Sequence, residues 1–300
     1  MEKIKVNMIM NEDKNILDQM YQDYLNCPAA VKNIKQLEIP EEKVIENITK
    51  IYDFVSDINY CKNCPGLSKC QKDKPGLVTR IVYKSGVVDR YLAPCKKMNE
   101  KMIFESNFIH HDFPDEWLDL IPRKDLDRNS GVRKEVLKAF GEYLNKGINS
   151  WIALNGTQRT GRTFLAAMLC MEAVNHHKGP AIFADCTLRF RELNDLAFSD
   201  KTRFNKVLDQ YCNIPILVLD DFGNEFKNEY VRDTIVLPIL LARSKKKLFT
   251  IITSDFSFSE IAILYDLSKS KAGQIKSEQL ERTLKGACPN VFNLGDLSIY

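Results

Sequence analysis

Long hydrophobic runs are missing from this chain. No stretch approaches the roughly 18 apolar residues that a membrane-spanning helix needs. An apolar signal core is also missing near Met1, because the first residues lead into the charged segment Asn11-Glu12-Asp13-Lys14. We therefore expect a cytoplasmic protein with no membrane partner.

Compositional bias is equally scarce. The sequence has no internal repeat and no low-complexity tract, and its 300 residues are 44% hydrophobic and 28% charged. These values are ordinary for a folded protein with a sizeable core, and they exclude disordered, collagen-like and coiled-coil classes. At about 150 residues per domain, the length favours two domains.

Charge is unevenly distributed. Residues 1–60 hold 7 basic and 11 acidic side chains, whereas residues 61–110 hold 10 basic and 4 acidic ones. Such a charge asymmetry is informative about binding partners and not about the fold. An acidic head followed by a basic module predicts separate surfaces for separate partners.

Disulfide bonds are not expected among the nine cysteines, because the cytosol keeps thiols reduced. Five of the cysteines are dispersed and are predicted to be small apolar packing residues. They are Cys27, Cys170, Cys186, Cys212 and Cys288.

The other four cysteines, Cys61, Cys64, Cys70 and Cys95, fall within 35 residues. A CxxC pair holds a metal between two thiolates, and tetrahedral Zn²⁺ needs four such ligands. Cys95 is the natural fourth ligand, with His110 and His111 as rivals. A redox CxxC is disfavoured because no thioredoxin-like βαβ pattern surrounds it. The spacing predicts a structural zinc site.

Apolar residues recur at helical spacing over residues 12–26 and 41–57, so residues 1–60 are predicted to form a small helical head. Residues 61–100 follow as the zinc module, with a β-hairpin around Lys84-Ser85-Gly86. Residues 101–132, of mixed polarity, are predicted to be a linker and lead-in.

From residue 133 to residue 300 helices alternate with short buried strands. The helices are expected over 133–146 and 277–286, and the strands end at Leu154 or span 181–184, 216–219 and 249–252. This alternation predicts an α/β domain with a parallel central sheet covered on both faces.

A phosphate-binding loop is predicted between the first of these strands and the helix after it. Backbone N–H groups at such a turn converge on an anion, and the helix N-terminus adds positive partial charge. Arg162 occupies the lysine position of this motif, and the Thr163 hydroxyl stands where Mg²⁺ needs a ligand. The loop is Gly156-Thr157-Gln158-Arg159-Thr160-Gly161-Arg162-Thr163.

Two adjacent acids, Asp220 and Asp221, end the strand at 216–219. The carboxyl ends of parallel strands face the crevice in which α/β sheets bind ligands. The first acid can hold Mg²⁺, and the second can orient or deprotonate an attacking water. Together the loop and the acid pair predict a nucleotide site.

Further site residues are predicted around this pair. Asp255, after the strand at 249–252, stands where phosphate-loop ATPases often sense the γ-phosphate, although a carboxylate there would repel phosphate. Arg282, on the helix at 277–286, is positioned to reach a neighbouring subunit's γ-phosphate. Arg232 and Arg243 are open alternatives for that role.

These residues together resemble the bacterial primosomal helicase loaders of the DnaI type, with DnaC-type loaders and IstB-type transposition ATPases as cousins. The likeness runs through 215–223, Val231-Arg232-Asp233, Pro238-Ile239-Leu240 and 253–256 in the family's order. It implies an AAA+ fold, ATP and Mg²⁺ as cofactors, and a head that binds the replicative hexameric helicase while the AAA+ domain binds single-stranded DNA. Oligomerisation is implied by the trans-acting arginine.

The family pattern is broken at three positions. Arg159 stands where the family usually has glycine, Arg162 replaces lysine, and Asp255 replaces asparagine. Two classes of function follow: a weak ATPase that loads the helicase, or an adaptor that binds the helicase without hydrolysing ATP. A transposition helper ATPase is a third alternative, against which the cysteine module counts.

Nucleic acid contact is predicted to be non-specific. The run Lys245-Lys246-Lys247 and the basic surplus of residues 61–110 can contact phosphates in a salt-sensitive way. An ordinary solvated surface is the alternative, and no base-reading motif is present.

Overall fold

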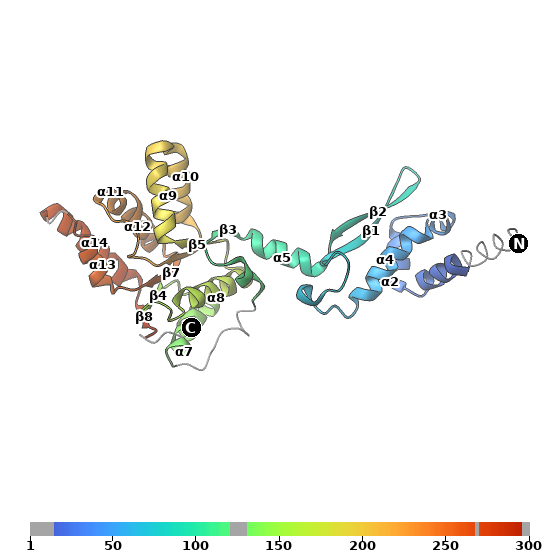
Figure 1. The fold of residues 1–300 in the computed structure, drawn as a ribbon, viewed down its shortest axis with the longest axis horizontal. Coiled ribbons are helices and arrows are strands. Elements are labelled where there is room, and N and C mark those ends of the chain that lie inside the picture. The colour runs from blue at the N-terminus through green and yellow to red at the C-terminus, as the bar shows by residue number, and fades with distance from the viewer. Residues whose placement is uncertain (1–14, 121–130, 268–269, 296–300) are drawn as a thin grey trace, which may run out of the picture. The chain divides into compact units, whose positions relative to one another are not determined.

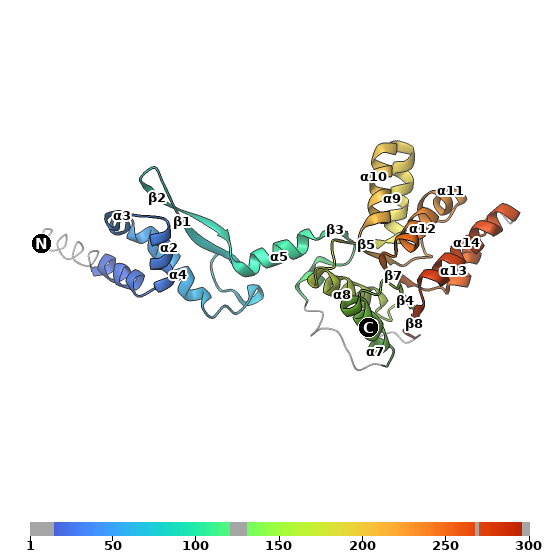
Figure 2. The ribbon, with the colours of Figure 1, turned by 180° about the vertical axis from the view of Figure 1, so that it is seen from behind.

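A computed structural model describes residues 15–120, 131–267 and 270–295. The chain divides into two compact units, Met1–Ile103 and Phe104–Tyr300. Both units are drawn in Figures 1 and 2.

The first unit contains a small helical bundle packed on a two-stranded sheet. Its described helices are α2 (Pro28–Gln36), α3 (Glu41–Glu46) and α4 (Ile48–Cys61), and residues 15–25 of the expected helix 12–26 are also helical. Residues 12–14 lie outside the described residues. Ile34, Ile51 and Phe54 are among the buried side chains of the core. The apolar spacing of the sequence therefore reflects a shared core.

The expected helix 41–57 is two helices. Asn47 separates α3 from α4, and its side-chain amide donates to the Lys43 carbonyl at 3.0 Å. Asparagine side chains compete with the backbone for hydrogen bonds in this way, which breaks a helix without removing the apolar periodicity.

The expected hairpin joins β1 (Leu77–Lys84) to β2 (Val87–Pro94) in an antiparallel pair. Its turn residues Ser85 and Gly86 both have positive φ, 53° and 78°. This is the backbone of a two-residue turn whose twist matches that of the strands.

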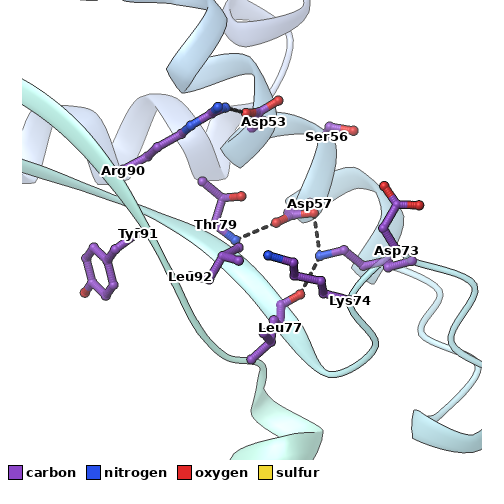
Figure 3. Close-up of a pocket in the computed structure, with 11 residues that line it drawn as sticks. Asp53, Ser56, Asp57, Asp73, Lys74, Leu77, Thr79, Arg90, Tyr91 and Leu92 are labelled. Carbon is purple, nitrogen blue, oxygen red and sulfur yellow. Dashed lines mark hydrogen bonds and ion pairs between the residues drawn. The ribbon is translucent and has the colours of Figure 1, made fainter.

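Polar contacts join α4 to the hairpin and line a cavity of about 540 Å³ (Figure 3). The Asp57 carboxylate accepts from the backbone N–H of Thr79 at 2.5 Å and pairs with Lys72 at 2.5 Å. Asp53 pairs with Arg90 above it. Because these side chains are engaged with one another, the polar walls of this cavity serve to fasten the helix to the sheet.

The second unit is built on a six-stranded sheet in the order β3-β5-β6-β7-β4-β8, and every pairing in it is parallel. Its central strands follow the buried runs of the sequence. The strands are β3 (Phe108–His111), β4 (Ile152–Asn155), β5 (Ala181–Asp185), β6 (Ile216–Asp220), β7 (Phe249–Ser254) and β8 (Asn290–Asn293).

Helices cover both faces of this sheet. Alternate residues of the central strands β4, β5, β6 and β7, such as Leu217 and Val218 of β6, belong to separate apolar cores on the two faces. The core with Val218 includes α7 (Gly131–Lys146) and α8 (Arg162–Asn175). The other core includes α9 (Cys186–Ser199), α10 (Lys201–Asn213), α12 (Leu237–Lys246), α13 (Phe258–Leu264) and α14 (Lys271–Ala287). The α/β fold with a parallel central sheet is as expected.

The edges of the sheet differ from the sequence expectation. The segment expected to be a linker carries α5 (Lys96–Ser106), the edge strand β3 and a short 3-10 helix, η2 (Asp115–Asp119). Strand β8 forms the opposite edge and was not expected. Edge strands are short and have few apolar residues, so their sequence signal is weak.

Short irregular elements complete the two units. Leu67–Lys69 is a 3-10 helix (η1) beside the clustered cysteines, and α11 (Glu229–Val231) continues into a π-helix, η3 (Arg232–Val236). No helix among the described residues is long and apolar enough to cross a membrane.

Candidate nucleotide site

The carboxyl ends of the central strands meet at one edge of the sheet. Asn155 at the end of β4 is level with Ser254 of β7, and Asp185 of β5 is level with Asp220 of β6. The expected loop leaves β4 at this edge, and the acid pair leaves β6 there. Parallel strands thus bring the two predicted motifs together, although 57 residues separate Thr163 from Asp220 in the chain.

The loop 156–161 turns sharply from β4 into α8. Gly156 has φ 149°, and a Cβ there would lie 2.9 Å from the Gly295 carbonyl oxygen, so the close approach requires glycine. Gly161 precedes α8 in the left-handed conformation, and no side chain caps the helix N-terminus. The first N–H groups of α8 therefore face the loop without a side-chain acceptor, as anion binding requires.

The other loop residues divide into exposed and buried positions. Thr157, Gln158 and Arg159 are exposed, whereas Thr160 is buried and donates to the Thr157 carbonyl at 2.9 Å. Arg159 has φ 65°. This conformation suits glycine, so the family's glycine at this position has a steric reason.

Thr163 and Asp220 lie in direct contact. The Thr163 hydroxyl donates to Asp220 Oδ2 at 3.0 Å, and the Thr253 hydroxyl donates to Asp220 Oδ1 at 2.6 Å. Burial raises the pKa of Asp220 to about 6, although both hydrogen bonds oppose the rise. A carboxylate and a hydroxyl placed side by side are oxygen ligands of the type that Mg²⁺ prefers.

Asp221 turns away from the strand in the left-handed conformation, with φ 52°, while its backbone N–H donates to Thr253 Oγ1 at 2.9 Å. Its side chain is 42% exposed. Burial raises its pKa, and the guanidinium of Arg162 lowers it. Strained backbone at a strand end is typical of functional positions.

Arg162, at the first position of α8, is only 5% exposed. Its Nη1 donates to the Gly156 carbonyl at 2.5 Å, and its Nη2 lies 2.6 Å from Asp255 Oδ1 and 3.4 Å from Asp221 Oδ1. The sequence does not by itself predict this ion pair between Arg162 and Asp255. The signal for it is that two departures from the family pattern carry opposite charges.

Of the three arginines considered for a neighbour's site, two are structural. Arg232 is 2% exposed and bonds Asp233 and the Tyr265 carbonyl. Arg243 is fully buried and donates to three carbonyls and the Thr250 hydroxyl. Arg282 on α14 is exposed, with its Nε 3.3 Å from the Glu278 carbonyl. Because Arg282 is the exposed one of the three, it remains the candidate for contacting a neighbouring subunit's γ-phosphate.

The four clustered cysteines lie in the first unit, but they do not form a metal site as placed. Burial raises the pKa of Cys61, with smaller contributions from Cys64 and Cys95. The backbone N–H groups of Lys72 and Gly76 lower the pKa of Cys70. Within the described part of the chain, no group of three or more His, Cys, Asp or Glu side chains is arranged to hold a metal.

The rival ligands His110 and His111 belong to β3 in the second unit. His110 Nε2 lies 3.0 Å from the Tyr211 hydroxyl, and His111 Nδ1 lies 3.2 Å from the Phe113 carbonyl. Both rings are thus engaged at the sheet edge.

The lysine run ends a helix. Lys245 and Lys246 lie in the last turn of α12, and Lys247 caps it in the left-handed conformation. Cations at a helix C-terminus stabilise it by interacting with the helix dipole. Stabilisation of the helix C-terminus explains the three lysines without a contact to nucleic acid.

Comparison with known proteins finds a similar protein along nearly the whole chain. The chain is 24% identical to the replicative helicase loader DnaI of Bacillus subtilis (strain 168) over 285 residues, which cover 91% of this chain and 90% of that protein. The chain is therefore similar to a DnaI-type helicase loader. The resemblance noted in the sequence is confirmed.

The fold agrees with this relationship. A crystal structure of DnaI matches with a TM-score of 0.54 at 24% identity, covering 63% of this chain and 97% of that one. A primosome component from Streptococcus pyogenes serotype M3, described as putative, matches with a TM-score of 0.51 at 18% identity, covering 66% and 98%. The family profile of IstB-like ATP binding proteins matches residues 136–270. The second unit therefore shares the α/β fold of these solved structures, with a parallel central sheet.

Proposed function

We propose that this DnaI relative is a primosomal protein that binds the replicative hexameric helicase and loads it onto DNA, using an ATP-binding AAA+ domain. The observation that carries the proposal is the similarity to the Bacillus loader along 91% of the chain. A transposition ATPase is less favoured, because the IstB-like profile matches only residues 136–270 and leaves out the first unit.

Helicase binding is tested with the full chain and the replicative helicase of the same organism in size-exclusion chromatography at low salt. We expect a co-eluting complex, and we assign its contact to the acidic head, residues 1–60. Reversing three exposed acids of the head, Glu38, Glu42 and Glu46, to lysine should weaken the complex. The same reversal of three exposed acids of the second unit, Glu135, Asp195 and Asp209, should not. Separate elution of wild-type chain and helicase would contradict the proposal.

The nucleotide site supports ATP and Mg²⁺ as cofactors. The N–H groups of the loop 156–161 and the start of α8 would hold the phosphates. Thr163 and Asp220 would hold Mg²⁺, which supplies charge neutralisation when bound. Asp221, beside them, would orient or deprotonate the attacking water, and its raised pKa suits that role.

The rate of ATP hydrolysis distinguishes the two hypotheses, a weak ATPase that loads the helicase and an adaptor that does not hydrolyse ATP. We expect a weak steady-state rate in the wild-type chain and at least a tenfold lower rate in Asp221→Asn. A wild-type rate equal to that of the variant would support the adaptor.

Zinc in the first unit remains part of the proposal, with Cys61, Cys64, Cys70 and Cys95 as ligands. Cys64 and Cys95 are near enough to raise the pKa of Cys61, although burial is its main cause, and a bound ion would have to bring the four thiols together. We expect about one zinc per purified chain by atomic absorption, and less in Cys61→Ser and Cys95→Ser than in the buried control Cys212→Ser. A zinc-free wild-type chain would contradict this assignment.

Single-stranded DNA is proposed as a non-specific partner of the AAA+ domain and of the basic surfaces, as the resemblance to the helicase loaders implies. Its binding should weaken steeply as salt rises, because the contacts would be to phosphates. Binding that is independent of salt would contradict a phosphate-based contact.

A further inference from the structure

Two of the three departures from the family pattern are in contact. Arg162 replaces lysine and Asp255 replaces asparagine, and their side chains form an ion pair with Nη2 2.6 Å from Oδ1. Arg162 begins α8 and Asp255 follows β7, so 93 residues of chain separate two substitutions that compensate each other's charge.

The pair is held from both sides. Arg162 also donates to the Gly156 carbonyl at 2.5 Å, which directs one arm of the guanidinium toward the base of the loop. Asp255 accepts from the Asn224 side-chain amide at 2.8 Å through its other oxygen. The Arg162 side chain is 6% exposed and that of Asp255 is 21% exposed, so solvent screens their attraction only partly.

This placement changes what each residue can do for a phosphate. A free cation at position 162 would attract the β- and γ-phosphates, but Nη2 of Arg162 lies 2.6 Å from the Asp255 carboxylate and 3.4 Å from the Asp221 carboxylate, which offset its charge. A carboxylate alone at position 255 would repel phosphate. With both carboxylates beside it, the guanidinium supplies no free positive charge where the family pattern has a cation.

We propose that Asp255 is a positioning residue that holds Arg162 away from an entering nucleoside triphosphate and thereby keeps the affinity of the site low. The proposal rests on the proposed function, because it assumes that the loop binds a triphosphate. Neutralising Asp255 removes its repelling charge and leaves Nη2 of Arg162 with only the longer contact to Asp221 at 3.4 Å, so triphosphate affinity rises. A purely structural ion pair would give no such gain.

The test is calorimetric titration of the full-length chain with Mg·ATP and, separately, with AMP, which lacks the β- and γ-phosphates. We expect Asp255→Asn to tighten ATP binding about tenfold, a change of about 1.4 kcal/mol. AMP binding should change less than about twofold. Asp209→Asn, on the exposed end of α10, is the control for an equal change of net charge.

A second pair of variants measures whether the two positions act together. Arg162→Lys should not tighten ATP binding while Asp255 is present, because the lysine would face the same carboxylate. In the Asp255→Asn background, Arg162→Lys should keep or further increase the gain in ATP affinity. Unfolding by denaturant, followed by tryptophan fluorescence, should show Asp255→Asn to be no more stable than wild type, so that tighter binding cannot come from a better fold.

Four results would overturn the proposal: unchanged or weaker ATP binding in Asp255→Asn, an equal gain for AMP, an equal gain in Asp209→Asn, or no ATP binding in any variant. Helicase binding is scored separately. A chain that binds no helicase but gains ATP affinity in Asp255→Asn would refute the loader function and leave this inference standing. If the wild-type chain binds ATP and Asp255→Asn leaves that affinity unchanged, this inference is refuted and the loader function is unaffected.

Discussion

At the scale of single residues, the loop departs from ordinary backbone geometry where the sequence departs from glycine. Arg159 has φ 65°, and left-handed backbone costs a residue with a Cβ about 1–2 kcal/mol. The preceding Gln158 does not have positive φ. The two neighbours therefore form a matched pair for a stability test.

We expect Arg159→Gly to be neutral or stabilising by up to about 1 kcal/mol, because relief of the left-handed strain offsets the greater entropy of the unfolded chain. Gln158→Gly lacks that relief and should destabilise by roughly 0.5–1 kcal/mol. Denaturant unfolding followed by tryptophan fluorescence reports on this unit, since both tryptophans, Trp117 and Trp151, belong to it. Equal losses in the two variants would contradict the strain at position 159.

The sequence predicted the residues of the candidate site better than their contacts. Thr163 and Asp220 could be placed together because parallel strands end at a common edge. The contact between Arg162 and Asp255 could not be predicted, because it depends on the rotamers of both side chains. Burial also separated the arginines: Arg232 and Arg243 read as exposed helix residues in the sequence, yet both lie inside the fold.

At the scale of elements, Arg243 of α12 joins the helix to the sheet without any carboxylate in its hydrogen bonds. It donates to the carbonyls of Tyr211, Ile214 and Phe249 and to the Thr250 hydroxyl. Burial lowers its pKa to about 9. Carbonyls at the end of α10 and the start of β7 thus depend on one guanidinium.

Replacing Arg243 by methionine keeps much of its volume but leaves these buried acceptors without a donor. We expect a loss of roughly 3–5 kcal/mol in the unfolding free energy of the second unit. Arg191→Met, an exposed arginine on α9, is the control and should change stability by less than about 0.5 kcal/mol. If both variants unfold at the same denaturant concentration, Arg243 does not have the proposed structural role.

The edge strand β3 gives a pH test. Burial lowers the pKa of His110, and Arg189 lowers it further, while Asp112 and Glu192 act in the opposite direction and His111 adds a small decrease. A histidine whose folded pKa lies below 6.5 binds fewer protons in the native than in the unfolded chain. Its contribution to stability is therefore lost as pH falls through 6.5.

The raised pKa of Asp220 acts in the opposite direction over the same pH range, so the test is a difference between two proteins. We expect the change from pH 7.5 to pH 5.5 to be less favourable to the folded wild-type chain than to His110→Gln, which keeps a polar group near Tyr211. The measurement is denaturant unfolding by tryptophan fluorescence at the two pH values. The same change in both proteins would exclude His110 as the titrating group.

The sequence predicts the central strands of the sheet, but it does not predict the edge strands or the break between helices α3 and α4. The buried runs of β5, β6 and β7 are unambiguous because parallel strands covered on both faces are apolar throughout. Strands β3 and β8 are short and partly exposed, and Asn47 divides an apolar pattern that otherwise reads as one helix. These features are set by tertiary contacts rather than by local periodicity.

At the scale of the whole molecule, the proposed trans role of Arg282 requires a neighbouring subunit. The exposed arginine bonds only a carbonyl of its own helix among the contacts described. In an oligomer, one subunit would supply Asp221 and the next would supply Arg282. Mixing two inactive variants therefore distinguishes a trans arginine from a cis one.

We expect Arg282→Ala and Asp221→Asn each to lose hydrolysis, and their mixture to regain a measurable part of the wild-type rate, because some interfaces then contain both native residues. Steady-state phosphate release measures this. A mixture no more active than its two components would contradict the trans arrangement, and Lys285→Ala on the same helix is the control for a general loss of charge.

We propose that Mg·ATP binds at the edge formed by the loop and the ends of strands β6 and β7. Equilibrium titration of the full chain with ATP up to millimolar concentration, with and without Mg²⁺, measures this binding. We expect saturable binding to one site per chain, weakened at least tenfold in Thr163→Ala. No saturable binding, or equal affinity in Thr163→Ala, would contradict the proposed site.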